Sequence, residues 1–224
     1  MSIARRLVAE LLGTALLLAA VVGSGIMGER LAGGNVAIAL LANSIATGAA
    51  LVALILTFGP ISGAHFNPFV TLCVADQSSL QRRDAVAYIA MQLVGAALGV
   101  VAAHFMFGEA IVSASTHVRA GLPQAFSEYV ATFGLVGVIC GCSRGRPEAV
   151  PFAVGLYIAA AYWFTASTSF ANPAVTLARA MTGTFAGIRP IDTPPFIVAQ
   201  FFGAISAAYL FRWLLPAPRS EERA

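Results

Sequence analysis

Charge is scarce in this sequence, and lysine is absent from it. Only 10% of the 224 residues are charged, 58% are hydrophobic, and the 13 basic residues are all arginines, leaving a net charge of +3. A soluble domain of this size does not need so many apolar residues to form its core. The composition therefore predicts a polytopic membrane protein. The arginines are scattered near the ends of apolar segments, which favours topology signals over a nucleic-acid-binding surface.

The motifs of metal sites and of common enzyme classes are also missing. The three cysteines, Cys73, Cys140 and Cys142, form no CxxC pair or His/Cys ligand cluster, so no disulfide framework, metal site or cofactor is expected. No HExxH or GxSxG motif occurs, and no paired carboxylates lie on one intramembrane helix. The sequence therefore argues against an enzyme.

Long apolar runs are what the sequence does contain. A spanning helix needs about 20 apolar residues. Six segments are predicted to span: Leu7–Met27, Asn35–Phe58, Arg82–Phe107, Ala125–Cys142, Ala149–Ala166 and Phe196–Leu215. The second of these is expected to end at Gly59-Pro60.

Two shorter segments share the pattern Asn-Pro-x-Val-Thr-Leu, starting at Asn67-Pro68-Phe69 and at Asn172-Pro173-Ala174. Asparagine is a favoured N-cap and proline fits the first helical position, so each copy predicts a helix start. The helices are expected to run to about Ala75 and Thr182. About ten residues each would give about 15 Å, half of the hydrocarbon thickness. Two surface loops with Asn-Pro turns are the alternative, but two matching copies in a membrane chain favour a pore.

The two copies belong to an internal repeat of three spans with the half-helix after the second. Repeat 1 covers about residues 5–107 and repeat 2 about 124–215, with Glu10 matching Glu128 and Gln92 matching Gln200. An odd number of spans inverts the second repeat in the membrane. The predicted fold is an all-α membrane protein, with six transmembrane helices and two re-entrant half-helices in a single channel domain over residues 1–224.

Arginine positions predict the orientation. Nine arginines, including Arg219 and Arg223 in the C-terminal tail, fall on one predicted side and four on the other. The positive-inside rule then places both termini in the cytoplasm.

The half-helix N-termini would meet at the midplane, and their dipoles would disfavour cations and protons there. Asn67 and Asn172 would each bring an NH2 donor group. The backbone before each of them would supply a ladder of carbonyl acceptors for small polar solutes. The acceptors are expected at Gly63, Ala64, His65 and Phe66, and at Thr168, Ser169, Phe170 and Ala171.

Three titratable residues lie within or beside the predicted spans. Glu10 and Glu128 are expected to hold the re-entrant loops by accepting backbone N–H bonds, and a proton relay is the alternative. His65 is expected to be a wall residue rather than a proton carrier.

These residues resemble the aquaporin (major intrinsic protein) family over essentially the whole chain. The twin Asn-Pro boxes, the glutamates of the first and fourth spans and the inverted repeat carry the resemblance. It implies a homotetramer in the lipid bilayer with one pore per protomer, passively conducting water or small neutral solutes.

Two departures from the family pattern bear on the solute. Phe69 stands where the family usually has alanine, and Val175 stands where it has the arginine of the narrow filter. By the same resemblance the filter falls on Thr47, Ser169, Val175 and a fifth-span residue. Counting back from Asn172 gives Ala160 for that residue and aligning from Gly155 gives Tyr162, which is preferred.

The pattern around the second box is similar to bacterial aquaglyceroporins of arsenic-resistance operons. That implies an inner-membrane channel for polyols and for arsenite, antimonite or methylated arsenicals. A plain water channel and a proton-coupled transporter stay open as alternatives. Arg179, four residues beyond Val175, could return a positive charge to the outer mouth, or it could snorkel to the interface.

Overall fold

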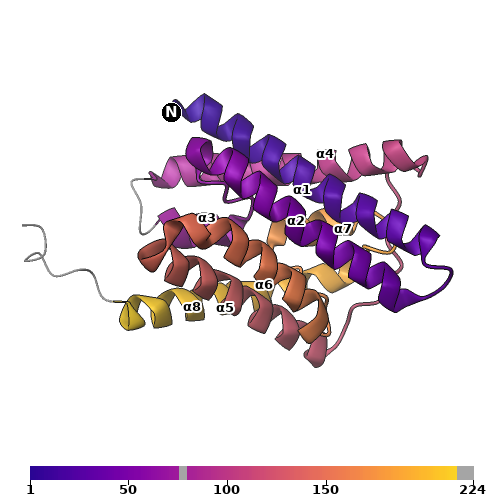
Figure 1. Ribbon diagram of the computed structural model, residues 1–224. Coiled ribbons are helices and arrows are strands. Elements are labelled where there is room, and N and C mark those ends of the chain that lie inside the picture. Colours follow the sequence, from indigo (N-terminus) through magenta and orange to yellow (C-terminus); the bar gives the residue numbers. More distant parts are fainter. Residues whose placement is uncertain (76–79, 216–224) are drawn as a thin grey trace, which may run out of the picture.

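The computed structural model of the protein describes residues 1–75 and 80–215, which contain helices and no strand (Figure 1). The predicted all-α fold is confirmed. The residues that follow the first predicted short helix, 76–79, and the topology arginines Arg219 and Arg223 lie outside the described residues. The helices are α1 (Ile3–Leu31), α2 (Val36–Ser62), α3 (Pro68–Ala75), α4 (Arg82–Phe107), α5 (Leu122–Gly145), α6 (Val150–Phe164), α7 (Pro173–Arg179) and α8 (Thr193–Leu214), with 3-10 turns η1 (Pro147–Ala149) and η2 (Pro190–Asp192).

Within the described residues, five helical segments are long and apolar enough to cross a membrane: α1, α2, α4, α5 and η2 with α8. The chain is therefore a multi-pass membrane protein. The predicted fifth span, Ala149–Ala166, is shorter than expected, because α6 has 15 residues, about 22 Å at 1.5 Å per residue. Its start is taken up by the 3-10 turn η1, and the backbone becomes extended at Thr165.

The expected end of the second span at Gly59-Pro60 is wrong. Helix α2 contains Pro60 and continues to Ser62, where Gly63 ends it in the left-handed conformation with φ 92°. Glycine reaches this conformation at little steric cost. The C-cap, and not the proline, therefore ends α2.

The two half-helices are shorter than the ten residues expected: α3 has 8 residues and α7 has 7. The prediction that α7 reaches Thr182 is wrong. The chain turns after Arg179 because the carbonyls of Ala180 and Met181 pair with the N–H groups of Ser115 and Ser113 in the loop before α5.

The helices pack as two matching groups. Helix α1 packs against α4 and α2, and α5 packs against α8 and α6, while α2 and α6 join the two groups. Glycines permit the closest approaches. A Cβ atom at Gly95 would lie 2.3 Å from the Leu11 carbonyl oxygen, and one at Gly203 would lie 2.4 Å from that of Tyr129. Each half-helix also packs across the boundary, α3 against α8 and α7 against α4.

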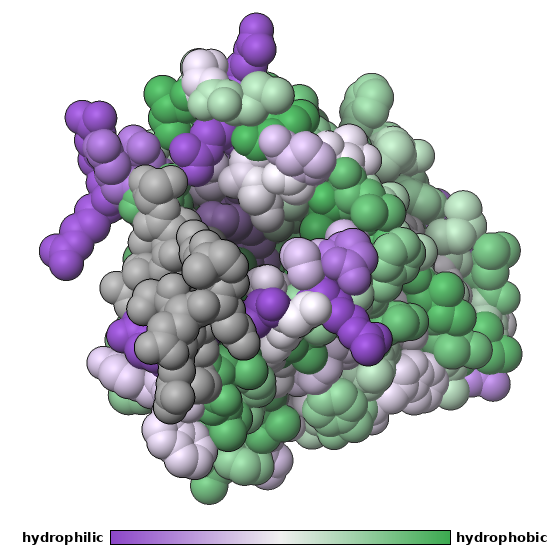
Figure 2. All heavy atoms as spheres, turned by 60° about the vertical axis from the view of Figure 1, so that its left-hand side comes forward, coloured by the Kyte–Doolittle hydropathy of each residue, from purple (hydrophilic) through white to green (hydrophobic). Residues whose placement is uncertain are grey.

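Both the start of α1 and the end of α8 lie at the left in Figure 1. We call this the proximal end, and the opposite end, where α1 ends and α5 begins, the distal end. Figure 2 brings the proximal end forward and shows hydrophilic side chains around it and hydrophobic ones over the flanks. Flank residues such as Phe105, Leu156 and Val198 are exposed, as expected for a surface that faces lipid.

Candidate pore

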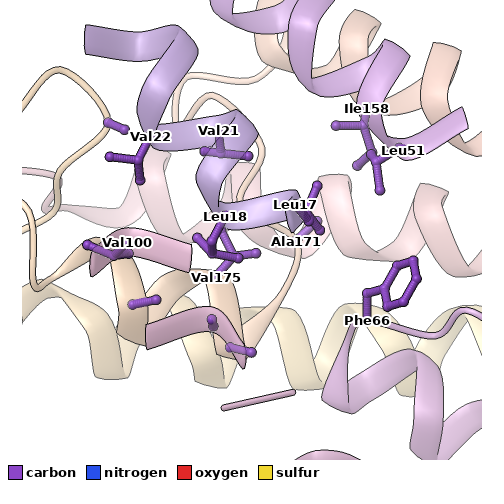
Figure 3. Close-up of a cluster of buried hydrophobic side chains, with 14 of the residues drawn as sticks. Leu17, Leu18, Val21, Val22, Leu51, Phe66, Val100, Ile158, Ala171 and Val175 are labelled. Carbon is purple, nitrogen blue, oxygen red and sulfur yellow. The ribbon is translucent and has the colours of Figure 1, made fainter. Parts of the chain in front are cut away.

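A cavity of about 240 Å³ lies between the two groups of helices. It is bounded by the segments that precede α3 and α7 and by apolar side chains of α1, α2, α5 and α6. Figure 3 shows Leu17, Leu51 and Ile158 among these apolar residues, with Phe66 and Ala171 from the two loops. The predicted site residues in its wall are Asn67 and Asn172, Thr47, Tyr162, Ser169 and Val175, and Gly63, Ala64, His65, Phe66, Phe170 and Ala171.

The segments before the half-helices have an unusual backbone. Ala64 and Phe66 in the first loop, and Thr168, Ser169 and Ala171 in the second, have φ between 48° and 61°. Non-glycine residues adopt this region at a cost of about 1–3 kcal/mol each, so surrounding contacts must hold the loops.

Glu10 supplies those contacts in the first loop. Its Oε1 accepts hydrogen bonds from Ser62 Oγ at 2.6 Å and the His65 N–H at 2.9 Å. Its Oε2 accepts from the Phe66 N–H and Gln92 Nε2, both at 2.8 Å. The carboxylate is fully buried, and four donors replace the hydration that it loses.

Glu128 makes the matching set in the second loop. Its Oε1 accepts from Ser167 Oγ at 2.5 Å and the Phe170 N–H at 2.9 Å. Its Oε2 accepts from the Ala171 N–H at 2.8 Å and Gln200 Nε2 at 2.6 Å. The structure thus brings each glutamate to the backbone of one re-entrant loop.

The two loops are joined through their asparagines. Asn67 Nδ2 donates to the Ala171 carbonyl and Asn172 Nδ2 donates to the Phe66 carbonyl, both at 2.8 Å. Each Oδ1 accepts the N–H of the residue two positions on, Phe69 or Ala174, at 2.9 Å. Because the oxygens are used in helix capping, the amides present donor hydrogens to the cavity.

Six carbonyls of the two loops accept no hydrogen bond from the described residues. They belong to Gly63, Ala64 and His65 in the first loop and to Thr168, Ser169 and Phe170 in the second. The carbonyls of Phe66 and Ala171, also predicted acceptors, each receive an asparagine N–H. Of the six free carbonyls, all but that of Thr168 belong to residues in the cavity wall. The loop side of the cavity therefore carries acceptors, and apolar side chains of α1, α2, α5 and α6 face it.

Near the distal end, the four predicted filter residues all line the cavity. Thr47 Oγ1 and Tyr162 Oη are 3.2 Å apart and share a hydrogen bond. Ser169 is buried, and its hydroxyl makes no hydrogen bond with the described residues. Ala160, the alternative to Tyr162, is exposed on the outer face of α6.

Phe69 lies away from the cavity. Its ring packs against Val136, Ala204 and Ala207 and is 5.8 Å from the ring of Phe201 on α8. A phenyl ring at this box position could constrict a pore beside the asparagines, but this ring lies outside the cavity and does not narrow it. The side chain of the third box position points outward from α3 toward α8. Pro68, Pro173 and Ala174 are also buried outside the cavity wall.

Arg179 lines the cavity one turn beyond Val175 and is 2% exposed. Snorkelling to the membrane interface is therefore wrong, because the side chain turns into the protein. Its Nε donates to the Ala186 carbonyl, and its guanidinium carbon lies 3.5 Å from the centroid of the Phe170 ring.

A second arginine, from the loop before α5, lies by the same ring. The guanidinium carbon of Arg119 is 5.2 Å from the Phe170 centroid, and its nitrogens donate to the carbonyls of Gly187 and Ser167. Burial lowers the pKa of Arg119 from its ordinary value.

Sequence reasoning missed Arg119 and most partners of the glutamates. Ser62 and Ser167 bind the glutamates directly, and Thr71 and Thr176 accept from Gln92 and Gln200. The repeat contained the signal: both serines lie five residues before their Asn-Pro box and both threonines four residues after its asparagine.

Comparisons with known proteins agree with this architecture. A family model described as major intrinsic protein matches residues 1–146 and 143–223. The chain is 57% identical to aquaglyceroporin AqpS of Rhizobium meliloti (strain 1021), over 96% of this chain and 92% of that protein. It is 29% identical to the probable aquaporin AqpM of Archaeoglobus fulgidus, over 96% of this chain and 98% of that protein. The X-ray structure of the aquaglyceroporin from Plasmodium falciparum matches with a TM-score of 0.75 at 21% identity, over 96% of this chain and 98% of that one.

Proposed function

Because the chain belongs to the major intrinsic protein family, we propose that it is a passive transmembrane channel for small neutral solutes, including water and glycerol-like polyols. Its role is transport and not catalysis. The distal end faces the outside of a bacterial inner membrane, and both termini are cytoplasmic, as the arginine distribution favours. Four protomers form a homotetramer with one pore each.

The observation that carries the proposal is the two-sided cavity wall. One side offers the free carbonyls of the two re-entrant loops, and the other offers hydrocarbon from residues such as Leu17, Leu51 and Ile158. A polyol has hydroxyls along one edge and C–H groups along the other, so it can exchange its hydration for both walls at once. Val175 leaves the filter position without the cation that would narrow it.

Neutral hydroxides of arsenic and antimony, and methylated arsenicals, belong to the same proposed substrate class. They present hydroxyl groups that can donate to the same carbonyls. The 57% identity to a protein named an aquaglyceroporin supports a solute larger than water.

Protons are excluded at the paired asparagines. Both amides present N–H donors, since each Oδ1 is engaged with a helix N-terminus. A water molecule that accepts from them has its lone pairs occupied and cannot relay a proton along the file. The dipoles of α3 and α7 oppose cations at the same point.

Swelling of proteoliposomes tests the function, with water, glycerol and arsenite compared side by side. We expect glycerol and arsenite to enter faster than into protein-free liposomes. High water permeability without solute entry would support a water-selective channel instead. Flux that follows an imposed pH gradient would support a proton-coupled transporter.

A further inference from the structure

We propose that the distal mouth of the cavity is a binding site for a small monovalent oxyanion of the carboxylate type, held by Arg179. The inference rests on the proposed channel function, since the site lies in the conduction path. The proposed ligand is an anion, unlike the neutral solutes of the channel. By occupying the mouth, it slows the entry of those solutes.

The distal mouth holds a buried cation without a counter-ion among the described residues. Arg179 is 2% exposed, and no carboxylate of the described residues forms an ion pair with it. Its guanidinium makes one hydrogen bond within the described residues, from Nε to the Ala186 carbonyl, so both terminal nitrogens keep their hydrogens free. A buried charge is costly unless it is paired or hydrogen-bonded. The cavity is where a partner can reach these nitrogens.

Hydroxyl donors line the same cavity as Arg179. Ser169 has a buried hydroxyl without a partner among the described residues, and the Thr47–Tyr162 pair, which shares one hydrogen bond, leaves one further hydroxyl hydrogen to donate. The planar guanidinium binds two oxygens of a planar oxyanion at once. Hydroxyl donors around such a pair would satisfy its remaining lone pairs.

The charges around Arg179 also favour an anion. Arg119 lies against the same Phe170 ring, and the Glu128 carboxylate is already occupied by four donors. Asp192 is bound to Arg189 through two hydrogen bonds of 2.9 Å. Arg179 and Arg119 thus lie against one ring, while the carboxylates of Glu128 and Asp192 are engaged by other donors, which leaves the mouth positive.

The pore beyond the mouth does not suit the same ligand. The free loop carbonyls are acceptors and repel an oxyanion, and the facing wall is hydrocarbon. An anion therefore stops at Arg179, while a neutral polyol, which can donate to the carbonyls, passes inward.

Nitrate is a suitable probe, because it is planar, monovalent and ionised at every working pH. Glycerol flux into proteoliposomes is measured in sodium nitrate and in sodium chloride of equal osmolarity. We expect nitrate to slow wild-type flux saturably, about twofold at half occupancy of the site. We expect nitrate sensitivity to be lost in Arg179→Gln and weakened in Arg179→Lys, whatever the basal glycerol flux of each variant.

The matched control is Arg30→Gln. Arg30 lies at the same distal end but is paired with Glu109 at 2.8 Å on the surface, so nitrate sensitivity should be retained. Nitrate-dependent thermal stabilisation of the purified wild-type protein, measured against chloride, gives a readout that needs no flux and no variant.

Equal nitrate sensitivity in wild type and Arg179→Gln would overturn the proposal. So would wild-type protein that shows no saturable effect of nitrate on either flux or melting temperature. If glycerol flux is absent while nitrate still stabilises the protein, the channel proposal fails and the anion site stands.

Discussion

Val175 sets the chemistry of the predicted filter at the scale of one residue. It is buried in the cavity wall, about 4.5 Å outward of Asn172 at 1.5 Å per residue. The hydroxyls of Thr47, Tyr162 and Ser169 share that stretch of wall, and the valine adds no donor to them. The next positive charge is one turn farther out, at Arg179.

We expect Val175→Arg to reduce glycerol and arsenite flux at least tenfold and to leave water flux within a few-fold. A guanidinium at this position would cross the opening and donate to the loop carbonyls, which leaves room for little more than one water. Stopped-flow light scattering on proteoliposomes measures all three rates. Val175→Ile serves as control, because it stays apolar and should keep glycerol flux. If Val175→Arg passes glycerol as fast as wild type, the narrowest point lies elsewhere.

The glutamates allow a second prediction at this scale. Glu128→Gln would turn an acceptor into an NH2 group facing the donors Ala171 N–H and Gln200 Nε2. Each buried group left unsatisfied costs about 1–3 kcal/mol. We therefore expect a clear fall in melting temperature and in yield of the assembled protein, and the same for Glu10→Gln.

Differential scanning fluorimetry of the detergent-purified variants measures this effect. The control is Glu148→Gln, since Glu148 is exposed in η1 and accepts no hydrogen bond from the loops. Wild-type stability and normal flux in Glu128→Gln would show that the carboxylate does not support the loop.

At the scale of elements, close helix pairs hold the half-helices in place. Helices α1 and α4 meet at Gly95, and α5 and α8 meet at Gly203, in each case against a carbonyl of the partner helix. Gln92 and Gln200, which bind the glutamates, lie one turn before these glycines on α4 and α8. The distance between the two helices of each pair therefore also sets the distance from the glutamine amide to the glutamate that holds the re-entrant loop.

We expect Gly203→Ala to destabilise the protein by about 1–3 kcal/mol, as overpacking in a tight core does. The added Cβ atom would lie 2.4 Å from the Tyr129 carbonyl oxygen, which belongs to backbone and cannot move alone. Gly141→Ala is the control, because its nearest neighbour is the Phe211 side chain at 3.8 Å. Thermal melts of both variants in one detergent compare them. A Gly203→Ala protein as stable as Gly141→Ala would contradict the close packing.

At the scale of the whole molecule, two inverted loops meet through reciprocal asparagine bonds. Asn67 reaches the carbonyl of Ala171, and Asn172 reaches that of Phe66. The point where the loops join is also the point where donors face the cavity. The proposed proton exclusion therefore depends on the assembled repeats and not on either half alone.

We expect purified protein in liposomes to conduct glycerol without a proton current. The measurement is a pH-sensitive dye trapped inside, with an imposed pH gradient and a valinomycin-clamped potential. A protonophore added at the end provides the positive control. A voltage-dependent proton flux above that of empty liposomes would refute exclusion at the asparagines.

Much of this protein could be predicted from the sequence because its signals are local or repeated. The apolar runs predicted spans, and the Asn-Pro boxes predicted helix starts at Asn67 and Asn172, where Asn172 is the N-cap of α7. The repeat paired Glu10 with Glu128, and the structure places each against one loop. These features depend on hydropathy, capping and periodicity, which a single chain records directly.

Only the tertiary structure decided where side chains point once helices cross. Phe69 turns toward α8 and not into the cavity, and Arg179 turns inward against Phe170. Arg119 comes from a loop far away in sequence, and its partners Ser167 and Gly187 follow from how the distal loops pack. The end of α7 depends likewise on hydrogen bonds to another loop. The sequence determined which segments cross or enter the membrane, whereas contacts between distant segments determined which residues face the pore, because they arise only when the two repeats pack together.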